Sequence, residues 1–317
     1  MPKVTFEMST TQQSYIAVEE SKTAAKPVSL ARLGDYLELI KPRISTMALI
    51  SVALGYTLAS AHSWSLLPLI HALLGIGLVA VGCNSLNQML EMKSDALMPR
   101  TANRPLPAGK ISLPEVLVFG IGAALTGIFY LATMVNLLTA FLAMMTLVLY
   151  VLVYTPLKRV TSLCTTIGAI PGAMPPILGW TAAGGNLNTS SFAIFAIMFF
   201  WQFPHFLAIA WLYRHQYHQA GLKMLPAADP APRMIGWMCV IYAAALIPVS
   251  LLPQYVSLTG TFYSVVALVL GIGYLVFSIR FLRNETRQTA RELIWFSLIY
   301  LPLLLLTLTW DRLQLFN

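Results

Sequence analysis

Apolar runs of about twenty residues recur along this chain of 317 residues, and they constrain its fold more than any other feature. A helix of that length crosses a hydrocarbon core about 30 Å thick. The composition agrees, because 57% of the residues are hydrophobic and only 10% are charged, unlike a soluble globular domain. The sequence therefore predicts an all-α polytopic membrane protein. We expect nine spans, at residues 40–61, 65–90, 113–134, 137–155, 161–183, 190–213, 233–252, 260–282 and 292–310.

Lys and Arg are unevenly distributed among the predicted loops. With the N-terminus inside, 19 of the 20 Lys and Arg residues fall in inner segments, and only Arg312 lies outside. Positive charge favours the cytoplasmic side of a membrane, so the pattern predicts a cytoplasmic N-terminus and a periplasmic C-terminus. The same bias accounts for the formal charge of +8 without a nucleic acid partner. Because the outer loops are short and uncharged, polar chemistry is expected at the cytoplasmic face.

The first 33 residues are polar and mixed in charge, without the apolar core of a secretory signal. We expect residues 1–33 to form a disordered cytoplasmic tail and residues 34–317 to form one nine-helix transmembrane domain. Three cysteines, Cys83, Cys164 and Cys239, lie in apolar segments and form no C-x-x-C pair. They are expected to serve as packing residues.

A polar stretch follows the second predicted span. If the span continues as a helix, Asn87, Glu91 and Asp95 fall at i, i+4 and i+8 and share one face. Two carboxylates and an amide so arranged suit Mg²⁺, which fills its other positions with water and phosphate oxygens. Arg100 and Arg104 follow, and guanidinium groups bind phosphate through paired hydrogen bonds. The pattern favours a metal and diphosphate site over its alternative, a solvated helix end followed by a positive-inside loop.

A second stretch surrounds the fifth predicted span. Lys158 and Arg159 precede it, and the span contains three prolines and three glycines between Gly168 and Gly179. Backbone groups freed by prolines are tolerated at membrane depth only beside protein or a water-filled cavity. The pattern indicates either a broken helix that lines a substrate chamber, with Lys158 and Arg159 at its mouth, or a kinked packing helix.

A third stretch carries Trp201 and His205 in the sixth predicted span, followed by a basic loop with Tyr217. An intramembrane histidine is a candidate for contact with a cofactor or an aromatic substrate. The alternative is a core histidine with its hydrogen bonds satisfied.

Together, these stretches resemble the UbiA-like intramembrane prenyltransferases, and in particular the haem branch of that family. The resemblance covers roughly residues 35–310. Its motifs are N-x-x-x-E-x-x-x-D-x-x-M-x-R-T-x-N-R-P at 87–105, Y-T-P-L-K-R-x-T with G-A-x-P-G-A-x-P-P-x-x-G-W at 154–180, and W-Q-F-P-H-F with Y-x-x-A-G-x-x-M-L-P at 201–226.

The resemblance implies an enzyme that transfers the farnesyl group of farnesyl diphosphate to a vinyl group of haem b. It implies Mg²⁺ as the cofactor, with the following roles: metal ligands Asn87, Glu91 and Asp95; catalytic residues Asn87, Glu91, Asp95, Arg100 and Lys158; diphosphate ligands Arg100, Arg104, Lys158 and Arg159; and a haem or prenyl pocket formed by Tyr154, Trp201, His205 and Tyr217. It also implies location in the bilayer of a bacterial inner membrane, with a haem A synthase or a terminal oxidase assembly protein as a partner.

The chain departs from the family pattern at two positions. Glu91 stands where the family often has Asp, and its carboxylate still offers oxygen ligands. Gln216 stands where the family usually has an acid, which removes a charge that would face a second metal ion. Asp229 is the nearby acid that would replace it.

Three other functions are compatible with parts of this pattern. A related prenyltransferase could use a quinone ring or another aromatic acceptor. A transporter would also contain broken helices, but it is expected to show internal repeats and polar residues at mid-membrane, which the sequence lacks. A non-catalytic assembly factor for an oxidase is the third alternative.

Overall fold

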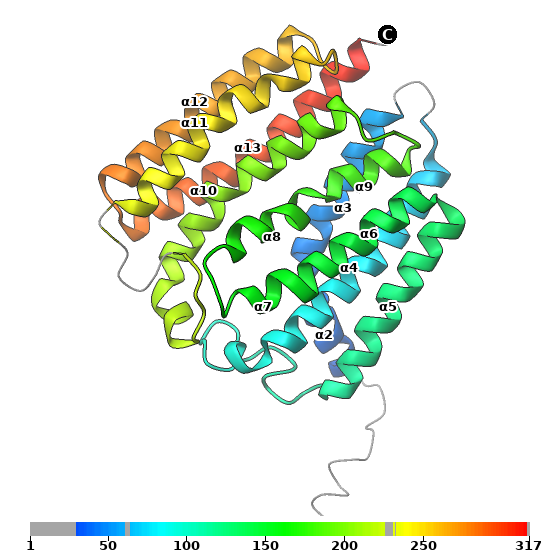
Figure 1. The fold of residues 1–317 in the computed structure, drawn as a ribbon, viewed down its shortest axis with the longest axis vertical. Coiled ribbons are helices and arrows are strands. Elements are labelled where there is room, and N and C mark those ends of the chain that lie inside the picture. The colour runs from blue at the N-terminus through cyan, green and yellow to red at the C-terminus, as the bar shows by residue number, and fades with distance from the viewer. Residues whose placement is uncertain (1–29, 61–63, 226–230, 232, 316–317) are drawn as a thin grey trace, which may run out of the picture.

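The computed structural model describes residues 30–60, 64–225, 231 and 233–315. None of these residues is in a strand. The helices run from the lower end of Figure 1 to its upper end and back. In chain order they are α2 (Leu30–Leu39), α3 (Pro42–Ala59), α4 (Leu66–Asp95), α5 (Leu113–Met134), α6 (Leu137–Val148), the π-helix η1 (Leu149–Tyr154), α7 (Thr155–Leu157), α8 (Cys164–Ala173), α9 (Pro175–Ala182), α10 (Thr189–Gln219), α11 (Met234–Tyr255), α12 (Thr261–Arg283) and α13 (Arg287–Gln314).

The predicted all-α polytopic fold is confirmed. Among the described residues, seven helical stretches are long and apolar enough to cross a membrane. They contain α4, α5, α6 with η1 and α7, α10, α11, α12 and α13. The other two predicted spans correspond to α3, which has 18 residues, and to the shorter pair α8 and α9. The predicted count of nine is therefore not matched by nine uninterrupted helices of full span length.

Prolines interrupt the fifth predicted span between α8 and α9. Pro175 and Pro176 have no N–H group, so they cannot continue the hydrogen bonding of α8. From α10, the Gln202 Nε2 group donates to the Ala169 carbonyl oxygen at 2.8 Å, and this bond fixes α8 against α10. The predicted broken helix is therefore present, and a neighbouring helix supplies part of its polar bonding.

Two glycines let α9 approach α3 at backbone distance. A Cβ atom added to Gly55 would lie 1.9 Å from the Pro176 carbonyl oxygen, and one added to Gly179 would lie 1.9 Å from that of Val52. Small residues permit such close helix contacts in membranes. The pair α3 and α9 lies between two apolar cores, one formed mainly with α10 to α13 and the other mainly with α4 to α6 (Figure 1).

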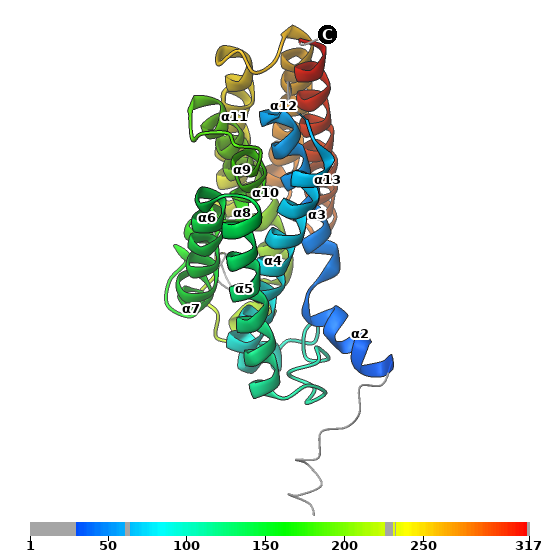
Figure 2. The same cartoon turned by 90° about the vertical axis from the view of Figure 1, so that its right-hand side faces the viewer.

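Helix α2 lies at the lower end and projects sideways from the bundle (Figure 2). It is tied to the start of α5, because Glu115 accepts hydrogen bonds from Tyr36 Oη at 2.5 Å and Arg32 at 3.2 Å. The helix begins at Leu30, so the predicted tail of residues 1–33 is wrong at its C-terminal boundary. Residues 1–29 of that tail lie outside the described residues.

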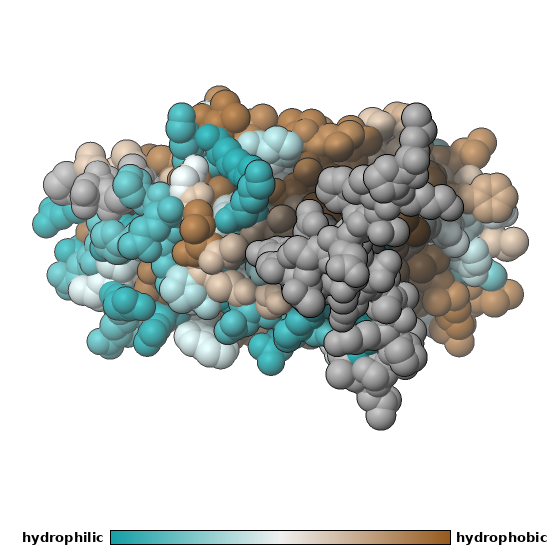
Figure 3. Space-filling view, turned by 90° about the horizontal axis from the view of Figure 1, so that it is seen from below, coloured by the Kyte–Doolittle hydropathy of each residue, from teal (hydrophilic) through white to brown (hydrophobic). Residues whose placement is uncertain are grey.

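The sides of the bundle expose large apolar side chains, with relative exposures of 73% for Val118, 71% for Phe129 and 75% for Leu137. Such a surface is stable against lipid and is unfavourable in water. Seen from the lower end, hydrophilic side chains gather on the left and in the centre of the face, and hydrophobic ones lie along its upper edge and on the right (Figure 3). The protein is an integral membrane protein.

Candidate active site

Helix α4 extends beyond its predicted end and carries the first motif on its last turns. The predicted span stops at residue 90, whereas α4 continues to Asp95. Asn87, Glu91 and Asp95 all line one pocket, here called the central pocket. Asn87 and Asp95 are each only 1% exposed, so their polar groups depend on partners inside the protein.

Each of these three side chains has a cationic partner. Lys41 Nζ donates to Asn87 Oδ1 at 2.8 Å, Lys158 Nζ lies 2.5 Å from Glu91 Oε1, and Arg104 lies 2.5 Å from Asp95 Oδ2. Charge-assisted hydrogen bonds of this kind are among the stronger ones in proteins. The α4 face is therefore neutralised by cations from three other segments.

The segment after α4 folds back under the pocket. Thr101 Oγ1 donates to the Asp95 carbonyl oxygen at 2.9 Å, which turns the chain at the helix end. Arg100 lies 3.5 Å from Tyr217 Oη and over the ring of Tyr213, 4.7 Å from its centroid. These contacts place Arg100 and Arg104 at the pocket, Arg100 beside α10 and Arg104 beside Asp95.

The π-helix η1 directs a second set of side chains into the pocket. The Thr155 N–H group donates to the Tyr150 carbonyl oxygen, five residues earlier, in place of the four-residue step of an α-helix. Tyr150, Tyr154 and Lys158 line the pocket, and Lys158 Nζ lies 4.3 Å from the centroid of the Tyr154 ring. A ring face that holds an ammonium group at this distance is suited to a cation.

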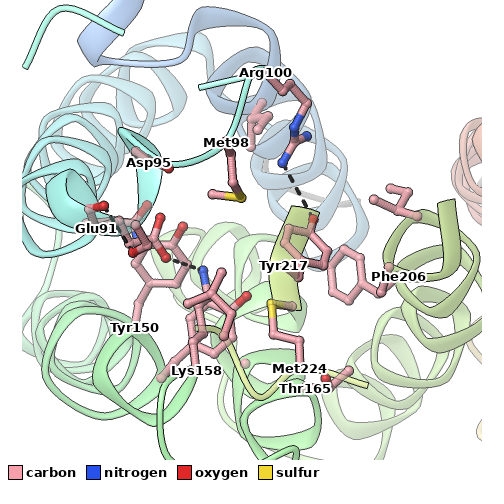
Figure 4. Close-up of a pocket in the computed structure, with 18 of the residues that line it drawn as sticks. Glu91, Asp95, Met98, Arg100, Tyr150, Lys158, Thr165, Phe206, Tyr217 and Met224 are labelled. Carbon is pink, nitrogen blue, oxygen red and sulfur yellow. Dashed lines mark hydrogen bonds and ion pairs between the residues drawn. The ribbon is translucent and has the colours of Figure 1, made fainter. Parts of the chain in front are cut away.

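The central pocket has a charged side and an apolar side (Figure 4). Its volume is about 260 Å³. Four cations and two acids line it: Lys41, Arg100, Arg104, Lys158, Glu91 and Asp95. The apolar side is built mainly by α10 and the following loop, from Phe206, Ile209, Ala210, Leu222, Met224 and Leu225. Such a cavity suits a ligand with an anionic head and an apolar body.

Burial changes the acidity of one of these cations. Lys41 lies between α2 and α3, and burial lowers the pKa of its ammonium group to about 8, although the nearby Glu91 carboxylate opposes the shift. Its backbone adopts a left-handed conformation with φ 51° at the junction of the two helices.

Eight of the predicted site residues line the central pocket: Asn87, Glu91, Asp95, Arg100, Arg104, Tyr154, Lys158 and Tyr217. Arg159 does not; it donates instead to the Leu90 carbonyl oxygen at 3.0 Å and to Ser94 Oγ at 3.2 Å. Sequence reasoning missed Lys41 as a site residue, and it also missed Tyr150 and the apolar residues Phe206 and Met224.

Trp201 and His205 lie away from the central pocket, against α13. Trp201 Nε1 donates to the Ser297 carbonyl oxygen at 2.9 Å, and His205 Nδ1 lies 2.6 Å from Ser297 Oγ. Their predicted part in a haem or prenyl pocket is not supported by this arrangement. Gln216 is also absent from the pocket lining, and its Oε1 atom is buried without a hydrogen-bond partner in the described part of the chain. Asp229 lies outside the described residues.

The chemistry of the α4 face fits Mg²⁺. Its amide and two carboxylates, on successive helical turns, offer the hard oxygen ligands that this ion prefers. No group of three or more His, Cys, Asp or Glu side chains that could hold a metal ion occurs among the described residues. A metal here would therefore use the Asn87 amide and oxygens from outside the protein in addition to Glu91 and Asp95.

Comparisons with known proteins agree with this fold. The model of the UbiA prenyltransferase family matches residues 48–301. The chain is 44% identical over 289 residues to the protohaem IX farnesyltransferase of Solibacter usitatus, covering 88% of this chain and 99% of that protein. The chain therefore belongs to the UbiA prenyltransferase family, and it is a prenyltransferase enzyme.

Two solved structures share its fold. A digeranylgeranylglyceryl phosphate synthase matches with a TM-score of 0.76 at 18% identity, covering 90% of this chain and 100% of that one. A UbiA homologue from Archaeoglobus fulgidus, bound to GPP and Mg²⁺, matches with a TM-score of 0.60 at 17% identity, covering 87% of this chain and 99% of that one.

Proposed function

We propose that this protein transfers the farnesyl group of farnesyl diphosphate to a vinyl group of haem b and so forms haem O. The observation that carries the proposal is the central pocket, whose four cations face an apolar side in a chain 44% identical to a protohaem IX farnesyltransferase. The cations suit a diphosphate, and the apolar side suits a prenyl chain and a porphyrin.

In the proposed reaction, the allylic C–O bond breaks and its electron pair leaves with the diphosphate. Arg100, Arg104 and Lys158 stabilise the growing negative charge. Stabilisation of developing charge is usually the largest single contribution to catalysis. The ring of Tyr154 shelters the allylic cation by a cation–π contact, as it now holds Lys158. The vinyl carbon forms the new C–C bond, and water adds to the resulting cation and releases a proton.

We propose that Asn87, Glu91 and Asp95 hold Mg²⁺, a role supported by their hard oxygen atoms and by the Mg²⁺ bound in the Archaeoglobus fulgidus homologue. When bound, the ion supplies further positive charge to the leaving diphosphate. In the absence of ligands, Glu91 and Asp95 pair with Lys158 and Arg104.

We also propose the location and organisation of the chain. The proposed location is a bacterial inner membrane, and the bias of Lys and Arg supports an N-terminus in the cytoplasm and a C-terminus in the periplasm. Residues 34–317 form one transmembrane domain in this proposal. A haem A synthase or a terminal oxidase assembly protein is the proposed partner that receives the product.

The test is direct. Purified protein is incubated with haem b, farnesyl diphosphate and Mg²⁺, and the pigment is identified by mass. A haem that has gained a farnesyl group and water supports the proposal. Transfer to a quinone-ring acceptor in its place would assign the other prenyltransferase function, and binding of haem without turnover would assign an assembly role.

A further inference from the structure

Three cations lie on the three side chains proposed as metal ligands, and one of them comes from an unexpected place. Lys158 follows α7, and Arg104 belongs to the segment after α4. Lys41 comes from the junction of α2 and α3, and its ammonium group reaches Asn87 Oδ1 at 2.8 Å. A metal ion cannot use these oxygens fully while the cations hold them.

The orientation of the Asn87 amide is fixed by a chain of hydrogen bonds. Thr155 Oγ1 donates its single proton to the Tyr150 carbonyl oxygen at 2.8 Å, so towards Asn87 it can only accept. The Asn87 Nδ2 group therefore donates to Thr155, at 3.0 Å. The amide oxygen is thereby turned towards Lys41, and it is the same atom that a metal ion would require.

The backbone of Lys41 is held while its side chain remains long enough to move. Asn84 Nδ2 donates to the Ile40 carbonyl oxygen at 3.0 Å, and Gln88 Nε2 donates to that of Leu39 at 2.6 Å. Both donors belong to α4, so the base of the Lys41 side chain is fixed to the same helix as Asn87. Its four methylene groups can then swing the ammonium group within the pocket.

We infer that Lys41 is a further substrate-binding residue that exchanges partners: it leaves Asn87 for the diphosphate when a metal ion takes the Asn87 oxygen. Lys158 and Arg104 make the same exchange from Glu91 and Asp95. The inference rests on the proposed function only for the identity of its two ligands, a diphosphate and a divalent cation. It makes the binding of the two ligands cooperative, because each ligand engages a partner that the other releases.

The first test uses inorganic pyrophosphate as the probe, in the presence of EDTA, with binding measured by calorimetry in detergent. Asn87→Ala leaves the formal charge unchanged and frees Lys41, so it should tighten pyrophosphate binding by about fivefold. In the double variant Lys41→Met/Asn87→Ala this gain should disappear. Unchanged or weaker binding by Asn87→Ala would overturn the inference.

Thr155→Val is the matched control. Like Asn87→Ala, it removes the hydrogen bond from Asn87 Nδ2 to Thr155. Unlike Asn87→Ala, it keeps the amide oxygen to which Lys41 Nζ donates. It should therefore give no gain in pyrophosphate affinity. A gain equal to that of Asn87→Ala would mean that the loss of the Thr155 bond, and not the release of Lys41, causes the effect, and this also would overturn the inference.

The second test measures Mg²⁺ binding without pyrophosphate, and it remains decisive if Asn87→Ala does not fold. Lys41→Met should tighten Mg²⁺ binding at least about fivefold, because it removes the group that occupies the amide oxygen. Arg43→Met is the control, because it removes an equal charge two residues from Lys41. The Arg43 side chain is exposed and lies outside the pocket lining. Equal effects of the two variants would show that the loss of a positive charge anywhere near the pocket tightens Mg²⁺ binding, and this would overturn the inference.

The two proposals fail in different experiments. If the wild-type protein makes no farnesylated haem but Asn87→Ala binds pyrophosphate more tightly through Lys41, the exchange stands and the proposed acceptor is wrong. If haem O forms but Asn87→Ala brings no gain, the proposed function stands and the exchange is wrong.

Discussion

The ring of Tyr154 lies directly against the backbone of Gly168. A Cβ atom added to Gly168 would lie 2.4 Å from Cε2 of Tyr154, too close for either group to stay in place. Tyr154 belongs to η1 and Gly168 to α8, so the broken helix supports the ring that holds Lys158. The position of the ring in the pocket thus depends on the absence of a side chain at residue 168.

We therefore predict that Gly168→Ala displaces the Tyr154 ring and lowers kcat for farnesyl transfer by roughly tenfold to a hundredfold, because small shifts of reacting groups have large effects on rate. The rate is measured by the mass of the haem product. Gly122→Ala in α5, where an added Cβ meets nothing within 4 Å, is the control and should keep full activity. Equal activity of the two variants would contradict the proposed role of Tyr154.

A second prediction concerns Asp95. Asp95→Asn removes the carboxylate paired with Arg104 and one of the proposed metal ligands, so turnover should fall by about a hundredfold or more. The folded protein should still be recovered from membranes with a normal elution profile. Activity close to that of the wild type would refute the assignment of the α4 face as the metal and diphosphate site.

A third prediction concerns stability at the other end of the bundle. The buried Asp311 of α13 accepts from the N–H groups of Gly260 at 2.5 Å and Tyr263 at 3.3 Å, and so caps the start of α12. Asp311→Asn should lower the free energy of unfolding by about 1 kcal/mol. Thermal unfolding in detergent measures the loss, and the turnover of the folded variant should not change. A variant as stable as the wild type would exclude a capping role.

A fourth prediction concerns topology. A reporter fused after Asn317 should lie in the periplasm, whereas one inserted beside Lys158 should lie in the cytoplasm, because all but one of the 20 Lys and Arg residues fall in the proposed inner segments. Reporter activity on the same side for both fusions would refute the proposed orientation.

A fifth prediction concerns the requirement for Mg²⁺. Removal of divalent cations by EDTA should stop transfer, and added Mg²⁺ should restore it. Gln216 lies in α10 outside the pocket lining, so Gln216→Glu should leave the Mg²⁺ concentration for half-maximal rate unchanged. A lower requirement would show that residue 216 does face the metal.

The charged side of the pocket could be predicted where the geometry is local. Asn87, Glu91 and Asp95 share a face because helical spacing alone decides it. Lys41 reaches the same face only through tertiary packing, and its sequence context, a basic residue before Pro42, is equally typical of a membrane anchor.

The apolar side could not be predicted for a different reason. In a soluble protein, polar residues mark the outer face of a helix, but here lipid-facing and pocket-facing residues are alike apolar. Phe206 lines the pocket and Trp237 faces outward at 56% exposure, yet the local sequence around each is hydrophobic. The sequence left two interpretations of His205 open and could not decide between them, because its partner, Ser297, is 92 residues away in the sequence.

The π-helix η1 makes the site depend on the width of one helical turn. Its wide turn holds one residue more than an α-helical turn would, as the bond from Thr155 to Tyr150 shows. If the same residues formed ordinary α-helical turns, everything after them would be rotated by about 100°. Tyr154 and Lys158 would then turn out of the pocket, although every side chain that faces it would still be present. In this segment the backbone hydrogen-bonding pattern is as much a part of the active site as the side chains that it orients.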